Sequence, residues 1–367
     1  MLLIDNATTA SVLAMPDVVA VLEQAYRDLA AGEALCRPRI DMRFPVDDRA
    51  VYQWGAMEGG SAASGYYAIR MKSDVLVEVE RDGNRTQEKH CVGPGTFCGL
   101  VFLLSTRTGE PLAILNDGVL QHMRVGADSA IGTRHAARED ARVLGMLGSG
   151  GMARTHLEAL LTVRPLERVQ VYSLTRANRE AYAVEMRDLH GIDVVAVDAP
   201  RDAFRGADVV AGCTDAAGDV IVGDWLEPGT HVTCIGGSVD ARARAAFDVW
   251  LRLGTAPAPV NDPDWRPTDE YLTYVARPHD PVWASHTHGR PRRPPTGPGA
   301  PRLVSLEDVL DGTDEARTSD EEITFSERGN IQGAQFFAVA GHVYEQCRER
   351  GLGRELPTAW FLQDVRD

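Results

Sequence analysis

The stretch ARVLGMLGSGGMARTHLEALL, residues 141–161, decides the fold of this chain. Its apolar first part ends in the pattern G-x-G-x-x-A, formed by Gly148, Gly150 and Ala153, and leads directly into a helical pattern. In such a turn the first glycine lets the chain reverse, the second lets backbone N–H groups approach a pyrophosphate, and the small third residue lets helix and strand pack closely. The helix N-terminus then faces the anion. The stretch predicts a dinucleotide-binding turn made by Gly148, Ser149, Gly150, Gly151 and Met152; the alternative is a glycine turn with a structural role alone.

The residues on both sides of this turn extend the same unit. An Ala-rich helix is expected before it, at 128–140, and apolar strands alternate with helices after it. Because parallel strands need crossover helices and are buried on both faces, this alternation predicts a Rossmann-type doubly wound parallel sheet. The expected strands are 141–148, 168–174, 193–197, 207–214 and 230–237, with helices at 152–163 and 178–191.

The end of the second strand bears on the choice of nicotinamide cofactor. An acidic side chain there would bind the ribose 2′-hydroxyl and repel a 2′-phosphate, and this chain has none. Ser173, Thr175, Arg176 and Arg179 instead offer hydroxyls and guanidinium groups suited to a phosphate. We therefore expect NADP(H) as the cofactor, and NAD(H) stays an open alternative. The alternative role for these four residues is plain capping of the next helix. After the fourth and fifth strands, the residues expected on the nicotinamide side are Cys213, Thr214 and Gly236.

The outer parts of the chain have another character. Residues 16–31 form an amphipathic helical pattern, closed by Gly32, and residues 41–114 consist of short apolar and aromatic runs typical of an antiparallel sheet. Proline is dense between 255 and 302, which predicts a long loop there. A last helix is expected at 333–353, ending near Gly353.

Composition excludes several classes of protein. The 367 residues suit two domains, and the formal charge of −15 argues against nucleic acid or an anionic membrane as a partner. The six cysteines show no close pairing, so we expect reduced thiols in a cytoplasmic protein and no metal site. No apolar run reaches the length of a membrane helix. His286 and His288 lack acidic or cysteine companions and are interpreted as incidental.

Three longer stretches carry a resemblance to a known family. TGEPLAILNDGVLQHMRVGADSAIGTRHAAREDARVLGMLGSGGMARTHLEAL, LEPGTHVTCIGG and, more loosely, TSDEEITFSERGN are similar to the ornithine cyclodeaminase/μ-crystallin family. The resemblance implies a homodimer with a discontinuous α+β domain for dimerisation and substrate binding, at 1–122 and 316–367. The Rossmann domain, at 123–315, would be inserted between these two segments and would carry the proline-rich loop.

The resemblance also implies a substrate site with basic residues that hold an α-carboxylate. Arg124 in QHMRVGADSA is the clearest match and Arg39 in CRPRIDM matches well, while a third basic residue falls on Arg70 or on Lys72 in YAIRMKSD. Residues 70 and 72 point to the same face of a strand, so which of them meets the substrate stays open. Like charge nearby would lower the pKa of Lys72 and suit it to proton transfer at an imine nitrogen.

One position departs from the family pattern. The family's cyclodeaminases have an aspartate after the glycine pair of the fifth strand, and this chain has Ser238, with Asp240 two residues later. A serine hydroxyl is no general base unaided, so ornithine cyclodeamination is not expected. We expect an NAD(P)-dependent oxidoreductase acting on the Cα–N bond of an amino acid or its (cyclic) imine. The alternatives are a redox-neutral ammonia-lyase and a non-catalytic binding protein; the sequence identifies neither the substrate nor the reaction direction.

Overall fold

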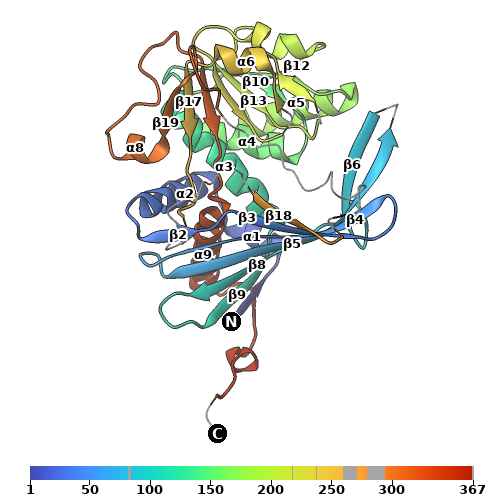
Figure 1. Cartoon of the computed structure of the whole chain (residues 1–367), viewed down its shortest axis with the longest axis vertical. Helices are drawn as coiled ribbons and strands as arrows, with labels where there is room; N and C mark the ends of the chain where they lie inside the picture. The colour runs from blue at the N-terminus through green and yellow to red at the C-terminus, as the bar shows by residue number, and fades with distance from the viewer. Residues whose placement is uncertain are drawn as a thin grey trace.

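The structure, a computed structural model, describes residues 1–81, 84–216, 218–236, 238–258, 271–277, 279 and 294–365. Two sheets face each other across the molecule, joined by a layer of helices (Figure 1). The first sheet lies near both chain termini, and the second is the predicted parallel sheet. None of the helices in the described ranges is long and apolar enough to cross a bilayer.

The first sheet is mostly antiparallel, as the runs in residues 41–114 predict. Its order is β18-β3-β4-β5-β8-β9-β1-β21, with β2 beside β4, and β6 and β7 continuing from β5. The strand bounds are β1 (Leu2–Ile4), β2 (Ala34–Cys36), β3 (Arg39–Pro45), β4 (Ala50–Ser61), β5 (Tyr66–Arg81), β6 (Asn84–Cys91), β7 (Gly93–Pro94), β8 (Cys98–Ser105), β9 (Pro111–Asn116), β18 (Tyr271–Val275) and β21 (Arg354–Glu355).

The second sheet is parallel throughout its described pairings. Its order is β12-β11-β10-β13-β15-β20-β17-β19, so the strand order reverses beside β10, the strand that leads into the glycine turn. The bounds are β10 (Val143–Leu147), β11 (Arg168–Tyr172), β12 (Asp193–Ala196), β13 (Val209–Gly212), β15 (His231–Cys234), β17 (Val249–Arg252), β19 (Arg302–Ser305) and β20 (Thr324–Glu327); a short parallel pair joins β14 (Asp219–Ile221) to β16 (Ser238–Val239). The predicted doubly wound architecture is confirmed. Ligands bind at such switch points in open α/β sheets.

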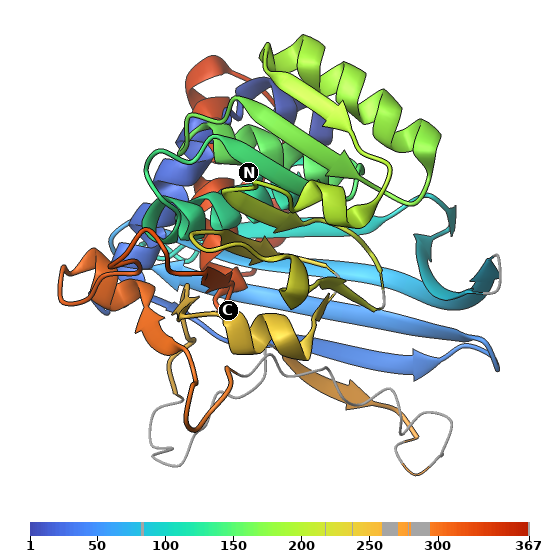
Figure 2. The same cartoon turned by 90° about the horizontal axis from the view of Figure 1, so that it is seen from above.

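Helices fill the space between the sheets and cover the parallel sheet. Their bounds are α1 (Asn6–Val12), α2 (Met15–Ala30), α3 (Gly118–Ala136), α4 (Gly151–Leu161), α5 (Arg176–His190), α6 (Ala241–Ala246), α8 (Leu306–Leu310) and α9 (Gln332–Arg350), with single turns η1 (Pro200–Ala203), η2 (Gly223–Trp225) and η3 (Thr358–Phe361). The helix α9 packs on β4 and β5, and α3 contacts both α2 and the parallel-sheet strands β15 and β20. The turned view shows β4 and β5 running beneath this whole assembly (Figure 2).

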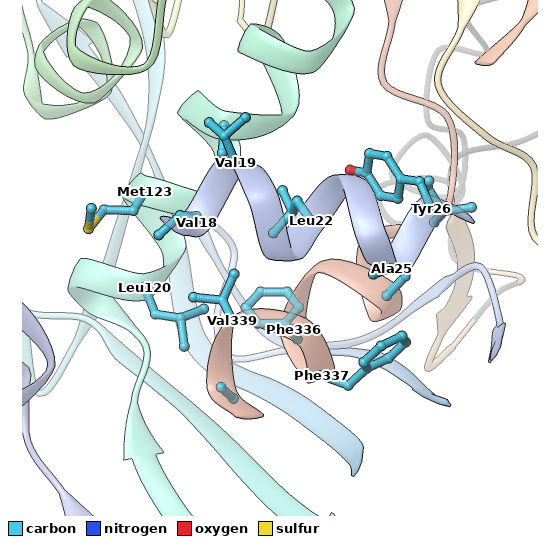
Figure 3. Close-up of a cluster of buried hydrophobic side chains, with 14 of the residues drawn as sticks. Val18, Val19, Leu22, Ala25, Tyr26, Leu120, Met123, Phe336, Phe337 and Val339 are labelled. Atoms are coloured by element: carbon cyan, nitrogen blue, oxygen red, sulfur yellow. The ribbon is translucent and has the colours of Figure 1, made fainter. Parts of the chain in front are cut away.

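The largest apolar core lies where α2, α3 and α9 meet. Leu22 of α2 and Phe336 of α9 are fully buried, and Leu120 of α3 packs into the same cluster (Figure 3). Burying a leucine or phenylalanine side chain contributes about 1.5–3 kcal/mol each. This core therefore packs α2 and α9, from the two ends of the chain, against α3. The functional side chains described below lie at the edge of this core.

Several element boundaries differ from the sequence prediction. α3 begins at Gly118 rather than at residue 128, because tertiary packing on α2 extends the helix over residues whose pattern was not distinctly helical. α9 ends before Gly351, whose φ of 65° lies in the left-handed region, rather than near Gly353. Between 255 and 302, the strand β18 interrupts the expected loop and pairs in parallel with β3. β20, at 324–327, still belongs to the parallel sheet, so the chain leaves that sheet after the expected boundary at 315/316.

Candidate active site

A cavity of about 1000 Å³ opens between the two sheets. Its larger wall, here called the glycine wall, follows the ends of β10, β11 and β13. Nine residues expected at a dinucleotide lie in it: Gly148, Ser149, Gly150, Gly151, Met152, Ser173, Thr175, Cys213 and Thr214. The cavity lining does not include two others, Arg176 and Gly236. The structure thus brings together residues from three strand ends that the sequence separates by 66 positions.

Gly148 and Gly150 of this wall are glycines for two different physical reasons. Gly148 has a φ of +119°, and a Cβ there would lie 2.2 Å from the Cys213 carbonyl oxygen, so no other residue fits without a shift. A Cβ on Gly150 would meet no protein atom within 4 Å. Gly150 therefore leaves space above the start of α4, where unpaired helix N–H groups can meet an anion. No side chain of the described residues caps this helix start.

The residues expected near a 2′-phosphate form the rim of the glycine wall. Ser149 Oγ donates a hydrogen bond to Ser173 Oγ at 2.9 Å. Arg176 is exposed and its Nε pairs with Glu180 at 2.7 Å. Arg179 is buried instead, with Nη1 donating to the Ser173 carbonyl oxygen at 3.0 Å, so this arginine braces the rim rather than pointing into the cavity.

The antiparallel sheet carries a charged face on the side that reaches the cavity lining at Lys89 of β6. Register places residues Asp41, Gly55 and Lys72 in one row, and Arg43, Gln53 and Asp74 in the next. We call the charged face the set Arg39, Asp41, Arg43, Gln53, Gly55, Arg70, Lys72 and Asp74. Side chains two residues apart share a strand face, so Arg70 and Lys72 do lie on one side, as the sequence predicts.

Each cation predicted on this face is held by a carboxylate. Lys72 Nζ lies 3.0 Å from Asp74 Oδ2, and Arg39 Nε lies 2.8 Å from Asp41 Oδ1. Arg70 Nε lies 2.6 Å from Asp117 Oδ2. The first two pairs fit because β4 has no side chain at Gly55, where a Cβ would lie 2.5 Å from Asp41 Oδ1 and 2.9 Å from Lys72 Cε. Arg70 and Lys72 are both buried, so the ion pairs orient their cationic groups firmly.

Arg124 has a different environment. Its side chain is buried on α3, with its guanidinium over the Phe336 ring. Nη1 donates to Gln335 Oε1 at 2.5 Å and Nη2 donates to Gln121 Oε1 at 2.8 Å, so its recorded partners are amide oxygens rather than carboxylates. Burial, and then the like charge of Arg328, lower the pKa of Arg124. A buried cation whose charge is not matched by a directly bonded anion is a good place for a ligand carboxylate.

Lys72 is the group on the charged face whose proton is most easily exchanged. Burial, and then the charges of Arg39 and Lys89, lower the pKa of Lys72 to about 8 against the attraction of Asp74. An ammonium group with a pKa near neutrality is suited to general acid–base work. The expectation of a depressed lysine pKa agrees with this environment, although burial rather than like charge is the main cause.

Comparison with known proteins identifies the family of this chain. Residues 5–351 match the model of the ornithine cyclodeaminase/mu-crystallin family. The chain belongs to that family. It is 28% identical over 344 residues, 92% of either chain, to an uncharacterized cyclodeaminase of Sinorhizobium fredii, and 24% identical over 356 residues to a Delta(1)-pyrroline-2-carboxylate reductase of Bacillus cereus, covering 97% of this chain and 99% of that one.

A solved structure shows the same fold. The Thermococcus litoralis Delta(1)-pyrroline-2-carboxylate reductase, in complex with NADH and L-proline, has a TM-score of 0.72 and 22% identity, with 97% of this chain and 100% of that chain covered. The resemblance inferred from residues 108–160 is therefore confirmed for the family and for the fold. The cofactor of that neighbour is NADH, so nothing in the comparison favours NADP(H).

Ser238 occupies the position at which the family's cyclodeaminases are expected to have aspartate, and it has a carboxylate beside it. Ser238 Oγ donates a hydrogen bond to Asp219 Oδ1, and Asp219 lines the cavity from β14. Asp240 is used elsewhere, since its side chain accepts hydrogen bonds from Ala243 N and Gly223 N at the start of α6. Asp219, 19 residues upstream of Ser238, carries no local motif, so sequence reasoning missed it.

Three further lining residues were also missed: Lys89, Phe97 and His122. His122 Nδ1 lies 2.7 Å from the Gly118 carbonyl oxygen, and its Nε2 lies close to Gly151, where a Cβ would be 3.1 Å from it. Its place two residues before Arg124 could have suggested it. Lys89 lies in β6 and Phe97 lies between β7 and β8, and only the tertiary fold brings them to the cavity. His286 and His288, like Arg290, Arg292 and Arg293, lie outside the described residues.

Proposed function

We propose that this chain is an NAD(P)-dependent oxidoreductase that acts on the Cα–N bond of an amino acid or its imine. The observation that carries the proposal is Arg124, a buried guanidinium held by amide oxygens on α3, the helix that also places His122 in the lining of the cavity beside the glycine turn. Arg124 and Arg70 would hold the substrate α-carboxylate, and Arg39 would assist. Positioning of this kind supplies much of the rate in such a reaction.

The fit of a dinucleotide rests on the glycine wall. Gly148, Gly150 and the first turn of α4 would hold the pyrophosphate, while Cys213 and Thr214 would lie near the nicotinamide, with Gly236 packed behind Thr214. When bound, the nicotinamide supplies or accepts the hydride exchanged with the substrate α-carbon. We prefer NADP(H) to NAD(H), because Ser173, Thr175 and Arg176 surround the expected 2′-position without an acidic lining residue on β11.

Lys72 would manage the proton on the substrate nitrogen. Its ammonium form can donate to an imine as the α-carbon is reduced, and its neutral form can accept from an amine in the reverse direction. The pKa of Lys72, lowered by burial to about 8, lets both forms exist near neutral pH. Ser238 would contact the substrate from the other side of the cleft.

The test is direct. Purified protein is given NADPH or NADH with 2-oxo acids plus ammonia or with cyclic imino acids, and amino acids with the oxidised cofactors, while the reduced-nicotinamide absorbance is followed. Turnover with at least one substrate is the expected result. Binding of neither cofactor, or cofactor binding with no absorbance change on any amino or imino acid, would contradict the proposal.

One observation favours a second candidate, a redox-neutral ammonia-lyase. The hydrogen bond from Ser238 to Asp219 restores a carboxylate close to the position where cyclodeaminases are expected to have aspartate. Such an enzyme would release ammonia from a diamino acid with cofactor retained and none added. We also propose, from the family resemblance and from the six free cysteines, a homodimer working in the cytoplasm.

A further inference from the structure

A chain of buried hydrogen bonds leads away from Arg124 and joins α2, α3 and α9. Gln335 of α9, which accepts from Arg124, donates its Nε2 hydrogen to Tyr26 Oη of α2 at 2.8 Å. Tyr26 Oη donates to Asp128 Oδ1 of α3 at 2.5 Å, and Arg328 Nε donates to Asp128 Oδ2 at 2.7 Å. Gln335 and Asp128 are fully buried and Tyr26 is 3% exposed, so these bonds are shielded from water.

The direction of this chain is set at the end far from Arg124. A guanidinium group can only donate, and an ionised carboxylate can only accept. Burial, and then the negative charge of Asp128, raise the pKa of Tyr26 well above its usual value, so the phenol keeps its proton. Because that proton is given to Asp128, the Tyr26 oxygen can only accept from Gln335. The Gln335 amide then points its NH₂ group to Tyr26 and its oxygen to Arg124.

This direction decides what Arg124 faces. With the Gln335 oxygen toward it, Nη1 has an acceptor that carries no charge, so the positive charge is not cancelled there. With the amide reversed, two donors would face each other and a buried donor would be left unpaired. The negative charge of Asp128, four residues along α3, opposes the fall in the pKa of Arg124, although its oxygens bond to other groups. Asp128 therefore stabilises the cation from a distance.

We propose that Asp128, Tyr26 and Gln335 are positioning residues for the reaction, because together they fix the hydrogen-bond direction that turns an amide oxygen to Arg124. They act through Arg124 and need no contact with the substrate. Their effect is to hold the guanidinium in one orientation, with its charge available for the α-carboxylate. This inference rests on the proposed function, in which Arg124 holds that carboxylate.

The first variant is Asp128→Asn, which keeps the shape of the side chain. Arg328 can only donate, so the asparagine oxygen has to face it and the NH₂ group has to face Tyr26. The Tyr26 oxygen then accepts from residue 128, its hydrogen turns to Gln335, and the Gln335 amide reverses. The assay uses the amino or imino acid that the wild type turns over fastest in the experiment above. We expect kcat/KM to fall about 100-fold, with cofactor affinity within about twofold of wild type.

The second variant, Tyr26→Phe, removes the hydroxyl that transmits the reversal. Alone it should lower kcat/KM by about fivefold or less, because attraction to Arg124 still turns the Gln335 oxygen toward it. In the double variant, Tyr26→Phe should restore most of the activity that Asp128→Asn removes, to within about threefold of Tyr26→Phe alone. A merely structural role for these residues predicts losses that accumulate and no rescue.

Two substitutions of the same kind elsewhere in the chain are the matched controls. Tyr66→Phe removes a hydroxyl that bonds to Glu345 at the surface, and Asp193→Asn removes a charge from an exposed ion pair with Arg168. Both should leave kcat/KM unchanged. The melting temperature of every variant is measured first, since Asp128→Asn removes a buried carboxylate from an ion pair.

A second pair of variants tests the inference even if Asp128→Asn does not fold. Gln335→Glu keeps the shape of the side chain and gives Arg124 a carboxylate, whereas Gln335→Met removes the hydrogen-bonding group and adds no charge. We expect a KM about tenfold or more higher for Gln335→Glu than for Gln335→Met, because the substrate carboxylate has to compete with a carboxylate of the protein. A role in shape alone predicts the opposite order, since glutamate is the closer match to glutamine.

Three results in an active enzyme would overturn the inference: Asp128→Asn as active as wild type, a double variant as impaired as Asp128→Asn, or a KM for Gln335→Glu no higher than that for Gln335→Met. The second result would mean that Asp128 acts through its charge alone. Absence of turnover in the wild type would refute the proposed function, and this inference with it. The two failures are therefore seen in different proteins, the wild type and its variants.

Discussion

The glycine wall lines the cavity and the charged face lies on the side of the antiparallel sheet that reaches this cavity at Lys89, but the two are built from different groups. On the glycine wall the important groups are backbone N–H groups and the space left by Gly150, and five of its lining residues are consecutive in the sequence. On the charged face they are side chains from β3, β4 and β5, held by carboxylates one or two rows away. A contiguous motif is thus enough to form the anion site proposed for a large cofactor. The proposed site for a small substrate instead needs residues that only folding brings together.

Removing Arg124 should have the largest effect, because it removes the buried cation proposed to hold the substrate α-carboxylate and leaves the glycine wall intact. Arg124→Met is expected to lower kcat/KM by about 10³-fold, equivalent to about 4 kcal/mol of lost transition-state stabilisation. Cofactor affinity, measured by fluorescence titration, should stay within twofold. Arg134→Met, at a partly exposed ion pair on the same helix, serves as the control. Unchanged turnover in Arg124→Met would remove the carboxylate assignment.

Two glycine substitutions should distinguish an effect on folding stability from an effect on cofactor affinity at the glycine wall. Gly148→Ala meets the Cys213 carbonyl oxygen and requires a positive φ, so it should cost about 1–3 kcal/mol of unfolding free energy as well as cofactor affinity. Gly150→Ala has space for its methyl group and should keep the melting temperature while weakening cofactor binding about 100-fold. Calorimetry and titration distinguish these effects. Equal cofactor affinity in Gly150→Ala and wild type would argue for a purely structural turn.

The pH dependence of kcat/KM tests the proposed role of Lys72 in proton transfer. Its pKa is lowered to about 8, so the ammonium form is lost as pH rises through that value. Imine reduction, which needs the ammonium, should decline above about pH 8, and amine oxidation, which needs the neutral amine, should rise over the same range. Lys72→Gln should abolish this inflection in kcat/KM and reduce kcat about 100-fold. An inflection that persists in the variant would belong to another group.

Asp219 should have a smaller effect. Asp219→Asn keeps the shape and a hydrogen-bond acceptor for Ser238 but removes the charge. If the enzyme is an oxidoreductase that uses Lys72 for the proton, kcat should fall by tenfold or less. Steady-state kinetics with Ser238→Ala as companion checks this. A loss as large as that of Lys72→Gln, together with ammonia release without added cofactor in the wild type, would favour the lyase.

Arg176 should have the smallest effect, since it is exposed and paired with Glu180. Arg176→Ala is expected to lower NADPH affinity about fivefold and to leave NADH affinity unchanged, in line with the modest value of exposed ion pairs. Cofactor titration measures both. Equal losses for the two cofactors, or a wild-type preference for NADH, would contradict the expected choice of NADP(H).

Particular residues show why the glycine wall could be predicted from the sequence more fully than the rest of the candidate site. Gly148 to Met152 could be placed at the cavity because a strand, a turn and a helix follow one another in the chain, and their geometry is local. The pairing of Ser238 with Asp219 depends on β14 and β16 lying side by side, 19 residues apart, and no local pattern announces that contact. Helix α3 likewise starts at Gly118 because it packs on α2, not because of its own periodicity.

The amino-acid sequence alone determined the parallel sheet and the family, and it placed a glycine turn after a strand and basic residues at positions 39, 70, 72 and 124, because each depends on neighbours within a few residues or on a long matching run. Only the tertiary structure decided which carboxylate each cation pairs with, that Arg124 is held by the amides of Gln121 and Gln335, and that Lys89 lines the cavity. Those facts depend on strand register and on contacts between distant segments, which long-range packing sets.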